Sequence, residues 1–425
     1  MTSVDLLVIN AAEVVTCAGF SQAPARGADL SAVGVVRDGA VAIGDGRILD
    51  VGASDRLRRE YRVDESKIVD CGGGVVLPGF VDCHTHMVFA GDRADEWAER
   101  MQGKPYLEIL KAGGGILSTV KKTRAASEAA LVAGARRWAK LALGLGTTTL
   151  EIKSGYCLDH DGELKMLAAA RALAEELPLE VVTTFLGAHV VPKEHKANRE
   201  KYLELVLETA AEVRRQNLAE YFDVFSEAEA FTVEEAERLA TKAKELGFGI
   251  KLHAEQFTAS GAAQLGVRLG AVSVDHLEHV DDATVAALSK GDTIGVLLPA
   301  VPFHLGMTDY APGRRLADAG VPLAIATDMN PGSACTPSIP MAIAIACRSV
   351  GLTPSEAVMA VTQNAAHALG RGAVTGSLEP GKRADLVVCD VPDHRWLGYA
   401  FGYNPVRTVI AKGKRVLKRE ELLLC

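Results

Sequence analysis

Short apolar segments alternate with helical segments along most of this chain, and this alternation limits the possible folds more than any other feature. Most of the apolar segments precede a stretch of helical periodicity, which is clearest over residues 127–145, 162–176, 198–216 and 232–246. Eight strand–helix units in one chain favour a (β/α)8 TIM-like barrel over a doubly wound open sheet. The expected strands are residues 75–77, 147–152, 181–186, 222–225, 249–252, 272–276, 294–298 and 323–326.

Both ends of the chain show a β pattern instead. The last barrel helix is expected over residues 355–369, and the tail beyond it returns to apolar strands. We therefore predict a small discontinuous β-sandwich domain built from both termini, residues 1–74 plus 372–425, beside a barrel domain over residues 75–371. The strands expected in the small domain are residues 6–9, 41–43, 48–51, 386–388 and 406–411.

The composition excludes several classes of protein. Apolar residues make up 48% of the chain and charged residues 24%, which is typical of a soluble globular protein. A net charge of −8 without a Lys/Arg tract argues against nucleic acid and membrane partners, so an anionic substrate would have to be bound by local Arg or amide groups. The 8 cysteines are scattered without a Cys-x-x-Cys pair, which predicts reduced thiols in a cytoplasmic protein.

Two histidines at the end of the first expected strand are the most informative residues. His84 and His86 follow the apolar run at 74–77, and side chains two residues apart on a strand point the same way. Neutral imidazole is a common ligand of zinc and iron. A His-x-His alone is more often a solvated or buried structural pair, so the interpretation depends on the ends of the later strands.

Those later strand ends supply further ligands. In a barrel of this kind the chemistry lies at the C-terminal ends of the strands. His253 and Asp328 end the fifth and eighth strands and make, with His84 and His86, a four-ligand site for one divalent ion with room for a water. Such an ion activates water and polarises a carbonyl oxygen, and Asp328 can accept the proton of that water. His276, after the sixth strand, could stabilise an oxyanion or shuttle a proton, or could be structural.

One metal is favoured over two. Lys153, after the second strand, could be mistaken for the bridging lysine of a two-metal site, but the fourth strand ends in Ser226-Glu227 without a lysine. His279 is ambiguous, because it could simply begin the loop after the sixth strand. The remaining histidines are expected to be surface or structural residues; they are His160, His195, His304, His367 and His394.

The set of His84, His86, His253, His276 and Asp328 resembles the amidohydrolase superfamily, in its single-metal branch. Further motifs are similar to those of the imidazolonepropionase family, from about Val75 to Arg371. These motifs are Phe89-Ala90-Gly91-Asp92-Arg93 with Glu96, Gly113-Gly114-Gly115-Ile116-Leu117-Ser118-Thr119-Val120, Glu151-Ile152-Lys153-Ser154-Gly155-Tyr156, Phe185-Leu186-Gly187-Ala188-His189 and Ala326-Thr327-Asp328-Met329-Asn330-Pro331-Gly332-Ser333.

The resemblance implies an activity and a set of site residues. The activity is hydrolysis of 4-imidazolone-5-propanoate to N-formimidoyl-L-glutamate, the third step of histidine degradation. The implied cofactor is one Zn²⁺ or Fe ion per chain, with zinc slightly favoured, and a homodimer is expected. The implied metal ligands are His84, His86, His253 and Asp328, with His276 catalytic and with Arg93, Tyr156, His189, Asn330, Gly332 and Ser333 around the substrate.

One position departs from part of that family. Gln256 stands three residues after His253, where a Glu can occur. A Gln can hydrogen-bond the substrate ring but cannot act as a base, so we assign proton transfer to Asp328 and His276 and count Gln256 as an assisting catalytic residue. Glu255 is expected to point away from the substrate if the strand continues.

The chemistry also fits the residues without the resemblance. Opening a cyclic amide needs an activated water, a polarised carbonyl and a proton for the leaving nitrogen, and a propanoate tail needs a cation such as Arg93. Two other functions remain open. One is a single-metal deaminase of a pyrimidine, purine or triazine ring, which would have no propanoate for Arg93 to bind. The other is a barrel without activity that serves binding or assembly, although retention of all four ligand candidates argues against it.

Overall fold

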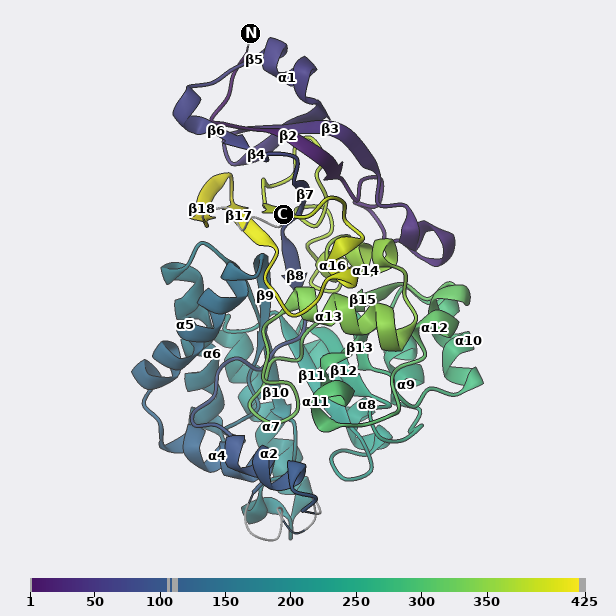
Figure 1. Cartoon of the computed structure of the whole chain (residues 1–425). Coiled ribbons are helices and arrows are strands. Elements are labelled where there is room, and N and C mark those ends of the chain that lie inside the picture. Colours follow the sequence, from purple (N-terminus) through teal and green to yellow (C-terminus); the bar gives the residue numbers. More distant parts are fainter. Residues whose placement is uncertain (1, 105–107, 109–113, 420–425) are drawn as a thin grey trace.

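The computed structural model describes residues 2–104, 108 and 114–419. Within these residues the chain forms a barrel surrounded by helices and, at one end of it, a separate β-sheet to which both termini contribute (Figure 1). Gly113 of the glycine-rich motif lies outside the described residues.

The barrel sheet has 8 parallel strands that pair in chain order, which confirms the predicted (β/α)8 fold. Seven of its strands match the expected ones within a few residues at each end, and the first does not. The strands are β8 (Phe80–Asp82), β9 (Thr147–Lys153), β10 (Glu180–Ala188), β11 (Tyr221–Ser226), β12 (Gly249–Ala254), β13 (Ser273–His276), β14 (Ile294–Leu297) and β15 (Leu323–Ile325).

The prediction of residues 75–77 as the first barrel strand is wrong. That segment is β7 (Val75–Pro78), which lies in the terminal sheet between β2 and β16. The chain then bends at Gly79, where a Cβ would overlap the side chain of Thr148, and enters the barrel as β8. One apolar run thus serves two sheets, because only Pro78-Gly79 interrupts it. The domain boundaries given above stay a prediction.

The ends of β8 and β15 meet and close the barrel. Both oxygens of the buried Asp82 carboxylate accept hydrogen bonds from Thr327, from its amide at 3.0 Å and from its hydroxyl at 2.6 Å. Beyond the strands, the amide of Asp328 donates to the carbonyl of His84 at 3.0 Å, and the amide of His86 donates to the carbonyl of Met329 at 2.9 Å. These bonds place the loop after the last strand directly beside the histidines after the first.

Helices cover the outside of the barrel (Figure 1). The capping boxes at Thr232 and Thr353 satisfy the first amides of α8 and α14, as their sequences favour. The helix expected over 355–369 is instead two helices, because the backbone leaves helical geometry at Thr362. The helices are α5 (Glu128–Gly144), α6 (His160–Glu176), α7 (Arg199–Arg215), α8 (Val233–Glu245), α9 (Ala262–Leu269), α10 (Asp282–Lys290), α11 (Ala300–Leu305), α12 (Gly313–Asp318), α13 (Ile339–Ile345), α14 (Pro354–Ala360) and α15 (Gln363–His367).

Among its described residues, the loop after β8 carries α2 (Ala94–Met101) and α4 (Ile116–Ala125). They lie at the end of the barrel farthest from the terminal sheet (Figure 1). Since β8 runs away from that sheet, α2 and α4 are on the side of the barrel where the parallel strands end.

The terminal sheet joins the two ends of the chain. Its order is β18-β17-β16-β7-β2-β3-β4, with β6 paired to β2, so β7 bridges N-terminal and C-terminal strands. A separate two-stranded sheet pairs β1 (Thr2–Ser3) with β5 (Tyr61–Arg62), and α1 (Ser54–Glu60) and α16 (Trp396–Tyr399) complete the region. The strands of the terminal sheet are β2 (Leu6–Val15), β3 (Val35–Gly44), β4 (Arg47–Ala53), β6 (Ile68–Asp70), β7 (Val75–Pro78), β16 (Leu386–Cys389), β17 (Val406–Ala411) and β18 (Lys414–Lys418).

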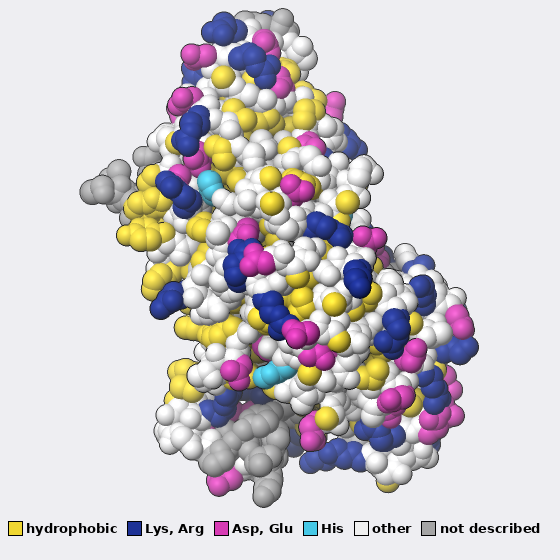
Figure 2. All heavy atoms as spheres, turned by 90° about the vertical axis from the view of Figure 1, so that its right-hand side faces the viewer, with side chains coloured by type: hydrophobic (Ala, Val, Ile, Leu, Met, Phe, Trp, Pro, Cys, Tyr) yellow, Lys and Arg dark blue, Asp and Glu magenta, His cyan; other side chains and the backbone are white. Residues whose placement is uncertain are grey.

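Charged side chains of both signs are mixed on one face of the molecule. Figure 2 shows Lys and Arg side chains next to Asp and Glu side chains over one whole face. Attraction of an anion therefore has to come from local groups, as the composition suggests. In the described part of the chain, none of the helices is long and apolar enough to span a membrane.

Candidate metal centre

Three imidazole rings meet at the C-terminal end of the barrel. His84 and His86 follow β8, and His253 lies in β12. The Nε2 atoms of His84 and His86 are 3.3 Å apart, and those of His253 and His86 are 3.4 Å apart. All three side chains are buried. The structure thus brings these predicted residues to one point with the same ring nitrogen facing inward.

A carboxylate completes the cluster. Asp328 follows β15 in a left-handed conformation, φ 50°. Its Oδ1 lies 3.3 Å from Nε2 of His86 and 3.5 Å from Nε2 of His84, and this buried oxygen accepts no hydrogen bond within the described residues. An unsatisfied buried carboxylate oxygen is costly unless a cation takes the place of the donor. Three imidazoles and one carboxylate are a normal donor set for a divalent ion, so these residues fit one.

Two carboxylates accept hydrogen bonds from the outward-facing Nδ1 atoms of His84 and His253. Nδ1 of His84 donates to Asp275 Oδ2 at 2.6 Å, and Nδ1 of His253 donates to Asp223 Oδ1 at 3.1 Å. Because each Nδ1 carries the proton in such a bond, each Nε2 keeps its lone pair for the centre. This is how histidine ligands are oriented around metals in proteins generally.

The protonation states suit metal ligands. Burial lowers the pKa of His84 well below its usual value, and burial lowers the pKa of His253 to about 4 although Asp223 opposes the shift. Burial raises the pKa of Asp328, but the neighbouring His86 and other rings outweigh it and the net pKa is lowered. His84 and His253 are therefore neutral and Asp328 is ionised at neutral pH, as metal binding requires.

A buried ion cluster lies beneath the histidines. The Lys153 ammonium, fully buried, is 2.8 Å from Asp223 Oδ2, 3.1 Å from Glu151 Oε1 and 3.7 Å from Asp275 Oδ2. Lys251 lies 3.4 Å from the same oxygen of Glu151. Burial lowers the pKa of Lys153, but its three carboxylate partners raise the pKa by more than burial lowers it. The net pKa is therefore raised and the side chain stays charged. Lys153 is thus an ion-pair partner of the residues that hold His84 and His253.

His276 stands beside the ligands in a strained backbone. Its φ is 88° and that of Leu277 is 69°, a conformation that non-glycine residues rarely adopt. Its ring centroid is 5.4 Å from that of His253 and 5.8 Å from that of His84. Burial lowers the pKa of His276, but Glu278, whose Oε2 is 3.6 Å from Nδ1, raises it and the net pKa is raised. His276 is therefore the most basic imidazole of this group whose shift is resolved.

Two aromatic side chains cover the other side of His86. The His189 ring stacks on His86 with centroids 5.2 Å apart, and the Tyr156 ring lies 5.8 Å from it. Nδ1 of His189 donates to the carbonyl of Gly155 at 3.0 Å, which leaves Nε2 as an acceptor. Both side chains are buried, so the structure places these two predicted substrate residues at the centre.

The loop after β15 is organised by Asn330. Its Oδ1 accepts hydrogen bonds from the amides of Gly332 and Ser333, both at 2.8 Å, and its Nδ2 donates to the carbonyl of Asp328 at 2.7 Å. The Asn330 side chain is thus engaged within the loop. Arg93, from the loop after β8, packs against Gly332, where a Cβ would overlap the guanidinium.

Gln256 and Glu255 lie just beyond β12. Gln256 is buried, and the carboxylate of Glu255 accepts hydrogen bonds from the amides of Gly261 at 2.8 Å and Ala263 at 2.9 Å. Glu255 therefore caps the start of α9 instead of pointing to the histidines.

Known proteins resemble this chain over nearly its whole length. A family model described as "Amidohydrolase family" matches residues 75–416. The imidazolonepropionase of Geobacillus kaustophilus is 45% identical over 97% of this chain and 98% of its own length. The imidazolonepropionase of Symbiobacterium thermophilum is 45% identical over 98% of each. The chain belongs to the imidazolonepropionase family of amidohydrolases.

Solved structures share the fold of this family member at lower identity. An adenosine deaminase from Xanthomonas campestris with bound zinc aligns with a TM-score of 0.73 and 22% identity, over 100% of this chain and 95% of that one. A mutant atrazine chlorohydrolase from Arthrobacter aurescens, complexed with zinc and atraton, aligns with a TM-score of 0.70 and 16% identity, over 99% and 97%. At these identities the likeness establishes the fold alone.

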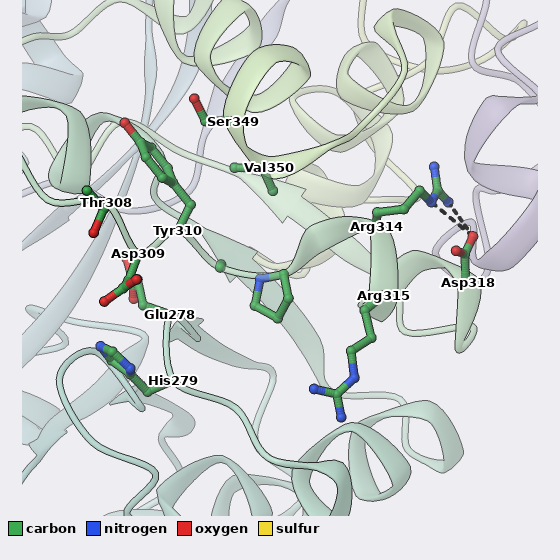
Figure 3. A pocket seen from close by; sticks show the side chains of 12 residues that line it. Glu278, His279, Thr308, Asp309, Tyr310, Arg314, Arg315, Asp318, Ser349 and Val350 are labelled. Carbon is green, nitrogen blue, oxygen red and sulfur yellow. Dashed lines mark hydrogen bonds and ion pairs between the residues drawn. The ribbon is translucent and has the colours of Figure 1, made fainter.

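A separate pocket is lined by residues that follow β13 and by residues of α12 and the segments next to it (Figure 3). It has a volume of about 990 Å³, and Glu278 and His279 line it together with residues 308–312, three residues of α12, Ser349 and Val350. None of the four ligand candidates lines it. Its guanidinium groups are already paired, Arg314 with Asp318 and Glu356, and Arg315 with Asp282. The cavity therefore does not replace the histidine cluster as the candidate active site.

Proposed function

We propose that this chain hydrolyses 4-imidazolone-5-propanoate to N-formimidoyl-L-glutamate, the third step of histidine degradation. The observation that carries the proposal is the full-length similarity to relatives named imidazolonepropionase. The site supports it chemically, since a ring amide, a carbonyl oxygen and a carboxylate tail each have a suitable partner among the residues described.

The proposed ligands are His84, His86, His253 and Asp328, holding one ion per chain. A bound divalent ion would supply an activated water and polarise the carbonyl oxygen of the ring. Both zinc and iron accept three imidazoles and a carboxylate, and we propose zinc slightly ahead of iron. Metal analysis of the purified protein decides between the two.

Asp328 is the proposed proton carrier. Its carboxylate is ionised, so one oxygen can face the ion while the other takes a proton from the attacking water. The water oxygen then bonds to the carbonyl carbon, and the bond from that carbon to the ring nitrogen breaks. The protonated Asp328 returns its proton to the leaving nitrogen, which completes the hydrolysis without any other acid.

His276 is proposed to stabilise the carbonyl oxygen as negative charge develops on it. Its raised pKa and its contact with Glu278 favour a ring that donates a hydrogen bond. Gln256 can hydrogen-bond the substrate ring but cannot carry a proton. Tyr156 and His189 lie beside His86 and shield that side of the His86 imidazole from water.

Arg93 is the proposed anchor of the propanoate tail. Its side chain is only 15% exposed, and a guanidinium can form two parallel hydrogen bonds with a carboxylate. Asn330, Gly332 and Ser333 are proposed to complete this part of the pocket, since they form the loop on which the guanidinium rests.

Substitution Arg93→Ala is expected to raise KM for the imidazolone about 30- to 150-fold, because two charge-assisted hydrogen bonds are worth about 2–3 kcal/mol. Metal content should not change. Steady-state kinetics measure the effect, with Arg100→Ala as the matched control on the same loop, because Arg100 donates to the carbonyl of Leu305 instead. An unchanged KM in Arg93→Ala would remove the anchor from the proposal.

The substrate itself is tested with freshly generated 4-imidazolone-5-propanoate. Loss of its ultraviolet absorbance, with formation of N-formimidoyl-L-glutamate, is the expected result. A metal-loaded protein that leaves the imidazolone intact but releases ammonia from a pyrimidine, purine or triazine would instead establish a deaminase on the same barrel.

We also propose that the protein is a cytoplasmic homodimer. Tyr399 and Phe401 expose 75% and 70% of their surfaces, and such apolar side chains suit contact with a second copy. Sedimentation equilibrium should give twice the chain mass of 44.9 kDa, and a single-chain mass would contradict the dimer. The described cysteines are free thiols, which agrees with a reducing compartment, and cell fractionation tests that location.

A further inference from the structure

The Arg93 guanidinium is held from behind by one carboxylate. Nε of Arg93 donates to Glu96 Oε2 at 3.1 Å, across the start of α2. Their side chains are 15% and 17% exposed, so the pair is largely shielded from water. An ion pair in such a place is stronger and better fixed than one on the surface.

The same carboxylate also fixes a second segment. The amide of Gly115 donates to Glu96 Oε2 at 3.0 Å, directly before α4. The carboxylate thus joins the loop that carries Arg93 to the start of the next helix of that loop. Because of this second hydrogen bond, the position of the Glu96 carboxylate does not depend on Arg93 alone.

Gly332 packs closely against the guanidinium. A Cβ at this position would overlap Nη1 and Cζ of Arg93, so the guanidinium lies where only a glycine leaves room. Gly332 in turn is held by Asn330, two residues after Asp328. The position of the guanidinium is therefore set relative to a ligand of the proposed metal.

These contacts leave the two terminal nitrogens of the guanidinium without a hydrogen-bond acceptor among the described residues. Within the described residues, hydrogen bonds from Arg93 are formed by Nε only, and neither terminal nitrogen donates. A carboxylate can bind a guanidinium along the edge of Nε or along the edge of the two terminal nitrogens. With Nε occupied by Glu96, only the second edge remains for a two-bond contact.

We infer that Glu96 and Gly332 are positioning residues that aim the terminal nitrogens of Arg93 at the carboxylate of the substrate. The inference rests on the proposed function for the identity of that substrate. On this inference, the preference for a substrate with a carboxylate tail depends on Arg93, Glu96 and Gly332 together, and not on Arg93 alone.

The first test is kinetic. Glu96→Ala is expected to raise KM for the imidazolone about 10-fold with kcat within 2-fold, because the guanidinium loses its orientation while the metal ligands are untouched. Glu96→Gln keeps an oxygen acceptor for Nε and should recover most of the loss. Glu99→Ala is the matched control, since Glu99 lies on the same helix as Glu96 and pairs with Lys104 beyond its end. An unchanged KM in Glu96→Ala would overturn the inference.

Gly332→Ala gives an independent variant. It should raise KM about as much as Arg93→Ala, and the double variant should be no worse than either single one, because both remove the same contact. Full additivity of the two effects would mean that Gly332 acts apart from Arg93 and would contradict its role as a positioning residue.

A binding measurement separates this inference from the proposed reaction. The probes are 3-(imidazol-4-yl)propanoate and its uncharged amide, titrated calorimetrically into the metal-loaded protein. The wild type should prefer the carboxylate about 10-fold or more, and Glu96→Ala should lose most of that preference. If the wild type shows the preference but does not open the imidazolone, the reaction is wrong and the positioning stands. If the wild type shows no preference, or Glu96→Ala keeps it, the positioning is wrong.

Discussion

Substitution Asp328→Ala is expected to abolish turnover, with a fall in kcat of at least about 10³- to 10⁴-fold. The side chain is at once a proposed metal ligand and the proposed proton carrier between water and the leaving nitrogen. Loss of general acid–base catalysis alone costs about 10²- to 10⁴-fold, and the damaged ligand set adds to that loss. Kinetics and metal content are measured on the same preparation.

A comparison of two variants separates the two roles of Asp328. Asp328→Asn keeps an oxygen ligand but cannot accept the proton, so it should retain more metal than Asp328→Ala and still be inactive. Asp292→Asn is the control, because this exposed carboxylate pairs only with Arg26 at the surface and should leave kcat unchanged. Normal activity in Asp328→Ala would contradict the mechanism.

Substitution Lys153→Met is expected to have the largest effect on stability. The ammonium is fully buried among Asp223, Glu151 and Asp275, and its removal leaves buried carboxylates with too few partners. Breaking a buried ion pair in this way costs about 3–5 kcal/mol. The free energy of unfolding of the metal-free protein, from urea or guanidinium denaturation, measures it without interference from metal binding.

The matched control is Lys242→Met. Lys242 forms an ion pair of the same length with Glu245, at 2.8 Å, but on the surface, with side chains 56% and 58% exposed. Such a pair contributes about 0–1 kcal/mol. Equal effects of the two substitutions would show that the buried cluster does not hold the strands beneath the histidines together.

Most of the barrel could be predicted from the sequence because each strand is a short apolar run before a helix with a clear start. The first strand could not. Val75–Pro78 and Phe80–Asp82 look like one apolar run, and only the pairing of β7 with β2 and β16 assigns the earlier half to the terminal sheet. Strand pairing is set by contacts far apart in the sequence, which periodicity does not report.

The candidate ligands were also accessible from sequence, because they follow strands that end at one rim. The supporting cluster is absent from the sequence predictions. Glu151, Asp223, Asp275 and Lys251 have no role in them, and Lys153 appears only as a possible bridging lysine of a two-metal site. A signal was present. Glu151 and Lys153, Lys251 and His253, and Ser273 and Asp275 stand two residues apart in apolar strands, so each pair points into the barrel. Charged residues in that pattern indicate an ion-paired barrel interior.

The substrate pocket needed the structure. Glu96 lies in a motif with Arg93, but its bond to the Gly115 amide joins residues 19 positions apart. The closeness of Gly332 and Arg93 arises because the loops after the first and last strands meet where the barrel closes. This contact follows from closure of the barrel, and no local sequence pattern predicts it.

The central claim is that one metal ion on the histidine cluster enables hydrolysis of the imidazolone, and a titration of metal-free protein tests it most directly. Zn²⁺ or Fe²⁺ is added in steps, and the rate of loss of 4-imidazolone-5-propanoate is recorded against bound metal per chain. The account predicts that the rate is negligible without metal, rises linearly and reaches its maximum at about one ion per chain. Full activity of the metal-free protein, or an intact imidazolone at full occupancy, would contradict it.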